Sequence, residues 1–163
     1  MKRKNMYILL LFVSLYANAQ EMPIGVSNKF TFPIGSKFTI KLVPKDSVNF
    51  DYSVVEFEKY SQVINMEDLK KLFVENGEEN TISFYFCLGT RGDTEEEKKK
   101  NMQILLLFKN YSDWQLDYST DIRREKDFEP TSNVGMFPGI IGIEMWPFVI
   151  YDIDIHQIKK HLK

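Results

Sequence analysis

The chain has 163 residues, with 21 basic and 23 acidic side chains and a net charge of −2. This length fits one domain. A mildly acidic chain is a poor candidate for nucleic acid, which selects basic faces, and the sequence lacks the polybasic clusters that hold proteins on anionic membranes. The single cysteine, Cys87, cannot form an internal disulfide, and we expect it to be a small buried side chain.

The first residues have the layout of a secretory signal peptide. Residues 2–4 are basic, residues 6–16 are almost wholly apolar, and the small residues Ala17 and Ala19 precede the expected cleavage point. The apolar run is too short to span a membrane, which takes about 20 residues. The sequence therefore predicts removal of residues 1–19, one mature domain over residues 20–163, no membrane association after cleavage, and export to the periplasm or the cell exterior.

Strand patterns fill most of the mature chain. Residues 37–43, 50–57 and 81–88 each place apolar side chains at every second position. One convincing helical pattern covers residues 66–76, where Asn65 can cap the start, an apolar stripe faces one side and a glycine follows. The charged run at residues 95–100 could form a turn of helix with i, i+3 opposite-sign pairs, but the expected structure is a solvated loop.

The stretch from residue 101 to residue 122 is predicted to organise the core. Its first half is apolar at alternate positions from Met102 to Phe108, and Leu105 and Leu107 make the opposite face apolar as well. A strand that is apolar on both faces is usually central in its sheet and covered on both sides. Turn residues at 110–113 lead into a second alternating strand, which predicts a hairpin.

These elements predict an all-β, mainly antiparallel fold. Seven or eight strands, one short helix and frequent turns are typical of an immunoglobulin-like β-sandwich, and a small closed β-barrel is the alternative.

The last strand carries the candidate metal ligands. Asp152, Asp154 and His156 alternate along it and would share one outer face, while Val149, Tyr151, Ile153 and Ile155 would form the inner face. Aspartate and histidine bind metal ions, so a metal site is one interpretation. A solvated outer face explains the same alternation.

Two other stretches could bind a partner. Arg91 and Asp93 flank a glycine and resemble the tripeptide by which matrix proteins bind integrins, although the glycine alone would serve a turn. Residues 135–147 mix glycine and proline with large apolar side chains, so this segment is either tucked under the sandwich or exposed to a partner. We expect Trp146 to be tucked and leave Phe137 open between the two.

Function is only weakly indicated. The sequence has no nucleophile motif and no phosphate-binding loop, and nothing in it calls for a cofactor or a catalytic residue. The favoured hypothesis is a non-catalytic exported protein that recognises a protein or a glycan through its surface. The alternatives are a sandwich or barrel that holds an apolar ligand between its faces and a metal-dependent hydrolase.

Overall fold

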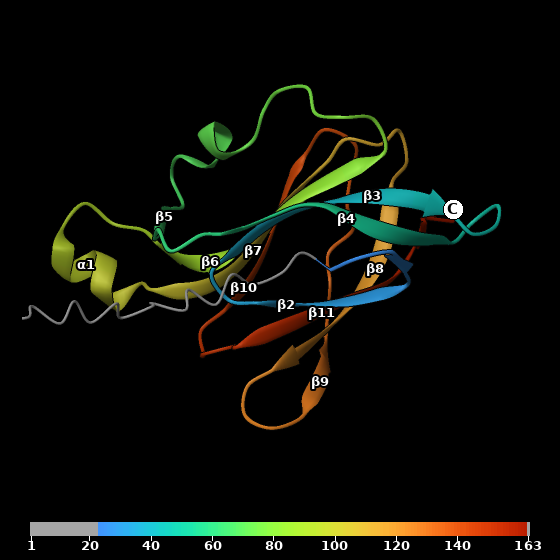
Figure 1. Cartoon of the computed structure of the whole chain (residues 1–163). Helices are drawn as coiled ribbons and strands as arrows, with labels where there is room; N and C mark the ends of the chain where they lie inside the picture. Colours follow the sequence, from blue (N-terminus) through green and yellow to red (C-terminus); the bar gives the residue numbers. More distant parts are fainter. Residues whose placement is uncertain (1–22, 163) are drawn as a thin grey trace, which may run out of the picture.

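The computed structural model describes residues 23–162, and the predicted signal peptide lies outside these described residues. The chain forms two sheets that face one another (Figure 1). The larger sheet contains, in spatial order, β1 (Val26–Ser27), β4 (Phe50–Lys59), β3 (Ser36–Pro44), β6 (Thr81–Thr90), β7 (Gln103–Asn110) and β10 (Ile141–Trp146), with β5 (Ile64–Asn65) beside β6. The smaller sheet contains β2 (Lys29–Pro33), β11 (Asp152–Lys160), β8 (Leu116–Arg123) and β9 (Phe128–Thr131).

Within residues 23–162 neither sheet closes into a barrel, so the predicted sandwich is confirmed. All strand pairs are antiparallel except the short contact between β5 and β6. The only α-helix of this region is α1 (Glu95–Lys100), and η1 (Leu69–Leu72) is a single 3-10 turn.

Aromatic side chains fill the space between the sheets. Phe32 of the small sheet stacks on Phe38 of the large sheet with ring centroids 3.6 Å apart, and Phe38 in turn stacks on Phe84. Tyr52 reaches across from β4: its hydroxyl donates to the Ile155 carbonyl at 2.6 Å and accepts the Phe30 amide. One hypothesis from the sequence places an apolar ligand between the two faces of the sandwich. Such a ligand would have to displace the side chains that are packed there.

Strand β7 is covered on both faces, as its sequence predicts. Ile104, Leu106 and Phe108 belong to the core between the sheets. Leu105 and Leu107 point to the other face, where they pack with Tyr85, Cys87, Ile64 and Phe73. The cover on that outer face is the segment between β4 and β6, drawn in green in Figure 1. Met102 precedes the strand and is exposed.

The predicted hairpin of residues 101–122 is wrong, because its two strands lie in different sheets. Both edges of β7 are already paired, with β6 on one side and β10 on the other. Asn110 turns the chain out of the sheet: its side-chain oxygen accepts from the Ser112 amide and hydroxyl, and its side-chain nitrogen donates to the Trp114 carbonyl at 2.8 Å.

The helix predicted over residues 66–76 is also wrong, since only η1 forms there. Backbone carbonyl groups of this segment accept hydrogen bonds from side chains of the large sheet instead of from helical amides. Tyr85 donates to the Leu72 carbonyl at 2.7 Å, and Lys109 donates to the carbonyls of Val74 and Glu75. Tertiary hydrogen bonds outweigh helix propensity here.

The charged run at residues 95–100 forms α1, contrary to the predicted loop. A capping box starts the helix: the Thr94 hydroxyl accepts the Glu97 amide, and the Glu97 carboxylate accepts the Thr94 amide. The hydrogen bonds to the Thr94 and Asp93 amides lower the pKa of Glu97.

The segment at residues 135–147 is divided between the core and the surface. Met136 and Trp146 are buried, and the Trp146 side chain is only 6% exposed. Phe137 is 50% exposed, and Ile140 next to it is exposed as well. Trp146 is therefore tucked as expected, whereas Phe137 lies on the surface.

Alanine substitutions should separate these two aromatic residues. Trp146→Ala is expected to lower the free energy of unfolding by about 3–5 kcal/mol, because it leaves a large cavity in the core. Phe137→Ala is the matched control and should change stability by less than about 0.5 kcal/mol. Urea denaturation of both variants provides the measurement, and equal losses would contradict the division of the segment.

Candidate functional site

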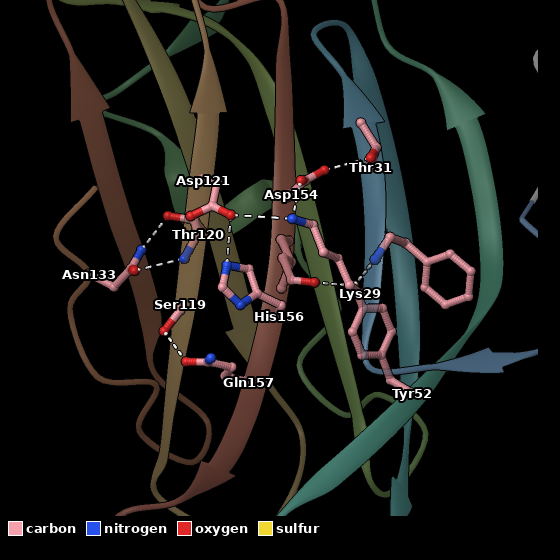
Figure 2. Close-up of polar contacts among 12 residues, drawn as sticks. Lys29, Thr31, Tyr52, Ser119, Thr120, Asp121, Asn133, Asp154, His156 and Gln157 are labelled. Carbon is pink, nitrogen blue, oxygen red and sulfur yellow. Dashed lines mark hydrogen bonds and ion pairs between the residues drawn. The ribbon is translucent and has the colours of Figure 1, made fainter. Parts of the chain in front are cut away.

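A polar cluster covers the outer face of the small sheet (Figure 2). It is built by strand register, because Asp154 on the central strand β11 lies opposite Thr31 of β2 and Asp121 of β8. His156, two positions further along β11, lies opposite Lys29 of β2. Residues that face each other across strands share one side of the sheet, so these five side chains meet.

Two carboxylates share one ammonium group at the centre of the cluster. Lys29 Nζ lies 2.6 Å from Asp154 Oδ2 and 3.2 Å from Asp121 Oδ2. The Thr31 hydroxyl donates to the other oxygen of Asp154 at 2.5 Å. His156 Nε2 is buried and lies 3.2 Å from Asp121 Oδ2, although the angle is too poor for a regular hydrogen bond.

The charges of the cluster compensate one another. Burial alone would raise the pKa of Asp121, but the hydrogen bond from Lys29 and the nearby His156 ring outweigh burial and lower this pKa below its ordinary value. The hydrogen bond to Asp154 raises the pKa of Lys29 against the opposing effect of burial. The nearly buried Asp154 is thus held by a cation and a hydroxyl, as a buried charge requires.

The predicted metal ligands are separated by these pairings. Asp152 does share the outer face, but it pairs with Arg123 of β8. Asp154 and His156 lie in one cluster, where the Lys29 ammonium occupies the place between the carboxylates. Within residues 23–162 no group of three His, Cys, Asp or Glu side chains is arranged to hold a metal ion.

Of the four residues predicted to form the inner face of the last strand, two are buried and two are exposed. Ile153 and Ile155 are buried in the core. Val149 and Tyr151 are exposed, because β11 begins at Asp152 and both residues lie in the connection before it.

Arg91 and Asp93 serve the helix that follows them. The Arg91 carbonyl accepts the Asn101 side-chain amide at 3.1 Å, and the Asp93 amide donates to the Glu97 carboxylate at 3.0 Å. Gly92 between them has a φ of +129°, and a Cβ there would lie 2.6 Å from Glu97 Cβ. The tripeptide thus leads into the N-terminus of α1, and adhesion stays an untested hypothesis.

An apolar groove of about 400 Å³ opens at one end of the sandwich. Three connections line it, at residues 34–35, 60–62 and 149–151, together with Leu88 of β6 and Ile104 of β7. Only Ser61 and Gln62 add polar side chains other than tyrosine hydroxyls. A smaller hollow of about 150 Å³ adjoins it, shares Leu88, Ile104 and Val149, and extends to residues 146–148.

The groove leaves large apolar side chains in solvent. Val149 is 59% exposed, Tyr151 is 50% exposed and Leu88 is 38% exposed. The sequence pattern predicts an inward position for Val149 and Tyr151 and puts Leu88 on the apolar face of its strand. Alternation alone does not show where a strand ends or where the opposite sheet stops. The one sequence signal for this site was the apolar segment that ends at Trp146 and Pro147.

Cys87 offers no nucleophile to either site. The thiol is buried on the outer face of the large sheet, and burial raises its pKa to about 12. Thiolate is the reactive form of cysteine, and such a pKa leaves almost none of it near neutral pH.

No known family model matches this chain, and no curated protein or solved structure is significantly similar to it. Within residues 23–162 no helix is both long and apolar enough to cross a membrane. The function has to be inferred from the two surfaces described above.

The polar cluster predicts a pH-dependent contribution to stability. Asp121→Asn should lower the free energy of unfolding by about 1 kcal/mol near pH 7, a modest loss because Lys29 is exposed and its ion pairs are screened. A carboxyl with a lowered folded pKa stabilises the fold above its unfolded pKa of about 3.9. The difference from the parent should therefore disappear as the pH falls toward about 2.

Asp117→Asn is the matched control, since Asp117 lies on the same strand and its carboxylate pairs with the exposed His161, outside the polar cluster. Urea unfolding from pH 7 to pH 2 measures both variants. The account of the cluster fails if the two variants show the same loss across that range.

Proposed function

We propose that the mature chain is an exported, non-catalytic binding protein, and that it holds an apolar ligand in the groove at the end of the sandwich. The observation that carries the proposal is the exposure of Val149, Tyr151 and Leu88 around one apolar hollow. Monomeric proteins rarely leave such side chains together in solvent without a use for them. A volume of about 400 Å³ falls in the range of small-ligand sites.

The groove is held by rigid elements. Leu88 and Ile104 face each other on β6 and β7, two interior strands of the large sheet. The Ile34 amide donates to the Tyr151 carbonyl at 2.8 Å, and the Tyr60 amide donates to the Gly35 carbonyl at 2.7 Å. These hydrogen bonds tie the three connections of the groove to one another and to the sheets, so the site is largely formed before a ligand arrives.

Binding is favoured over catalysis because the acidic, basic and histidine side chains lie elsewhere. Of the described residues 23–162, no Asp, Glu, His, Lys or Arg lines the groove or the adjoining hollow. The charged residues of the polar cluster lie on the outer face of the small sheet, where they satisfy one another. Recognition of a protein or a glycan, the hypothesis favoured by the sequence, is the alternative, and a protein would have to insert an apolar side chain into the same hollow.

Binding of the neutral dye Nile red tests the proposal. We expect saturable binding with increased fluorescence, and Val149→Asp should weaken it at least tenfold because the change puts a charge on the apolar wall. Val74→Asp is the matched control, since Val74 is also exposed but lies far from the groove lining. Both variants should keep the parent's melting temperature within a few degrees.

Either of two results would overturn the proposal: no saturable dye binding by the parent, or the same loss of binding in both variants.

A further inference from the structure

The adjoining hollow has a cation at its rim. The Arg124 guanidinium carbon lies 4.1 Å from the ring centroid of Phe148, a residue that lines the hollow. Arg124 is exposed and has no carboxylate partner within residues 23–162. The neighbouring Arg123 differs, because it pairs with Asp152 and donates to the Glu125 carbonyl.

We infer that the ligand of the groove is an apolar chain that ends in a carboxylate, with the chain along the groove and the carboxylate on Arg124. This inference rests on the proposed function. A guanidinium stacked on an aromatic ring is held by the ring face and keeps its N–H donors in its own plane. These donors match the two oxygens of a carboxylate, which is the strongest common type of charged hydrogen bond.

The lining of the groove agrees with an anionic ligand. Among residues 23–162 no acidic side chain lines the groove or the adjoining hollow. Arg124 itself also lines a separate surface pocket with Glu125, Lys126, Asp127 and Glu129, so the ligand's carboxylate would have to reach the guanidinium from the side of Phe148. Arg123 also borders the groove, 5.9 Å from the ring centroid of Tyr151, but it is paired with Asp152. Arg124 is therefore the bordering arginine that lacks a carboxylate partner among residues 23–162. The ligand's apolar part would contact Val149, Tyr151 and Leu88, which are the side chains left in solvent.

An alkyl chain fits the walls better than a peptide does. A bound peptide needs partners for its backbone N–H and C=O groups, and leaving them buried without partners is costly. Strands β6 and β7 contribute side chains to the groove, but their backbone groups are already paired. Leu88 of β6 faces Ile104 of β7, β5 pairs with β6 at the next residue, and β10 pairs with β7 at Ile104. An alkyl chain has no polar groups along its length and loses nothing against such walls.

Displacement of Nile red by paired ligands tests the inference. Decanoate, used below its micelle concentration at pH 7.5, should compete about tenfold more strongly than 1-decanol, which has the same chain without the charge. Arg124→Gln should reduce the affinity for decanoate about tenfold and leave that for 1-decanol unchanged. Arg91→Gln is the matched control, an exposed arginine outside the groove lining, and should change neither affinity.

The outcomes distinguish this inference from the proposed function. The carboxylate assignment is overturned if Nile red and 1-decanol bind but decanoate binds no more tightly than 1-decanol. It is also overturned if Arg124→Gln lowers the affinity for both ligands equally. In either case the proposal of an apolar groove is retained. If an apolar peptide with an amidated C-terminus competes more strongly than decanoate, the ligand class is wrong. If none of these compounds nor the dye binds, both proposals fail.

Discussion

The fold depends on one strand that is apolar on both faces. Strand β7 carries Leu106 and Phe108 on one side and Leu105 and Leu107 on the other, and all four are fully buried. Hydrophobic burial is the dominant favourable term in folding, so neither face can be left in water. The small sheet covers the inner face, and the segment between β4 and β6 covers the outer face.

The same requirement explains why the groove exists. At this end the strands of the large sheet extend past those of the small sheet. Strand β11 starts at Asp152 and β2 ends at Pro33, and beyond these residues the small sheet continues only as connections. Leu88 and Ile104 lie beyond that point and are covered by residues 149–151 and 60–62 in part. The partial cover leaves apolar surface in a fixed, concave shape, which is what a binding site for an apolar group needs.

Polar groups hold the cover in place without taking part in the groove. Lys29, Asp121, Asp154 and His156 link the three main strands of the small sheet on its outer face (Figure 2). Inside the sandwich, the buried Glu144 accepts hydrogen bonds from the Tyr118 hydroxyl at 2.9 Å and from the Val134 amide at 2.7 Å. The outer cluster thus holds the strands of the small sheet together, and the hydrogen bond between Tyr118 and Glu144 joins the small sheet to the large one. The lining of the groove includes none of these groups.

Much of the sheet structure could be predicted from the sequence, because alternation of apolar residues reports directly which face of a strand is buried. The burial of Phe38 and Ile40, and the two covered faces of β7, follow from that pattern alone. Pairing could not be predicted, because the turn after Asn110 suits a hairpin and a crossover equally. The crossover forms because both edges of β7 are taken by β6 and β10, which leaves no edge for β8.

The candidate sites were harder to predict, because they too depend on which strands pair and where each strand ends. Asp154 and His156 were recognised as one face, but their partners Lys29 and Asp121 come from strands far away in the sequence. Tyr151 and Val149 continue the alternation of β11 and look like core residues until the end of the strand is known. The capping box of Thr94 and Glu97 was a local signal that could have placed α1 correctly.

The central claim is that the end of the sandwich is the recognition surface. An NMR titration of the isotope-labelled mature protein with 1-decanol tests it most directly, because backbone amide shifts locate a ligand without a substitution. The account predicts shifts confined to the groove, at Gly35, Tyr60, Leu88 and residues 149–151. Shifts centred on Lys29 and His156, or on Phe137 and Ile140, would contradict it.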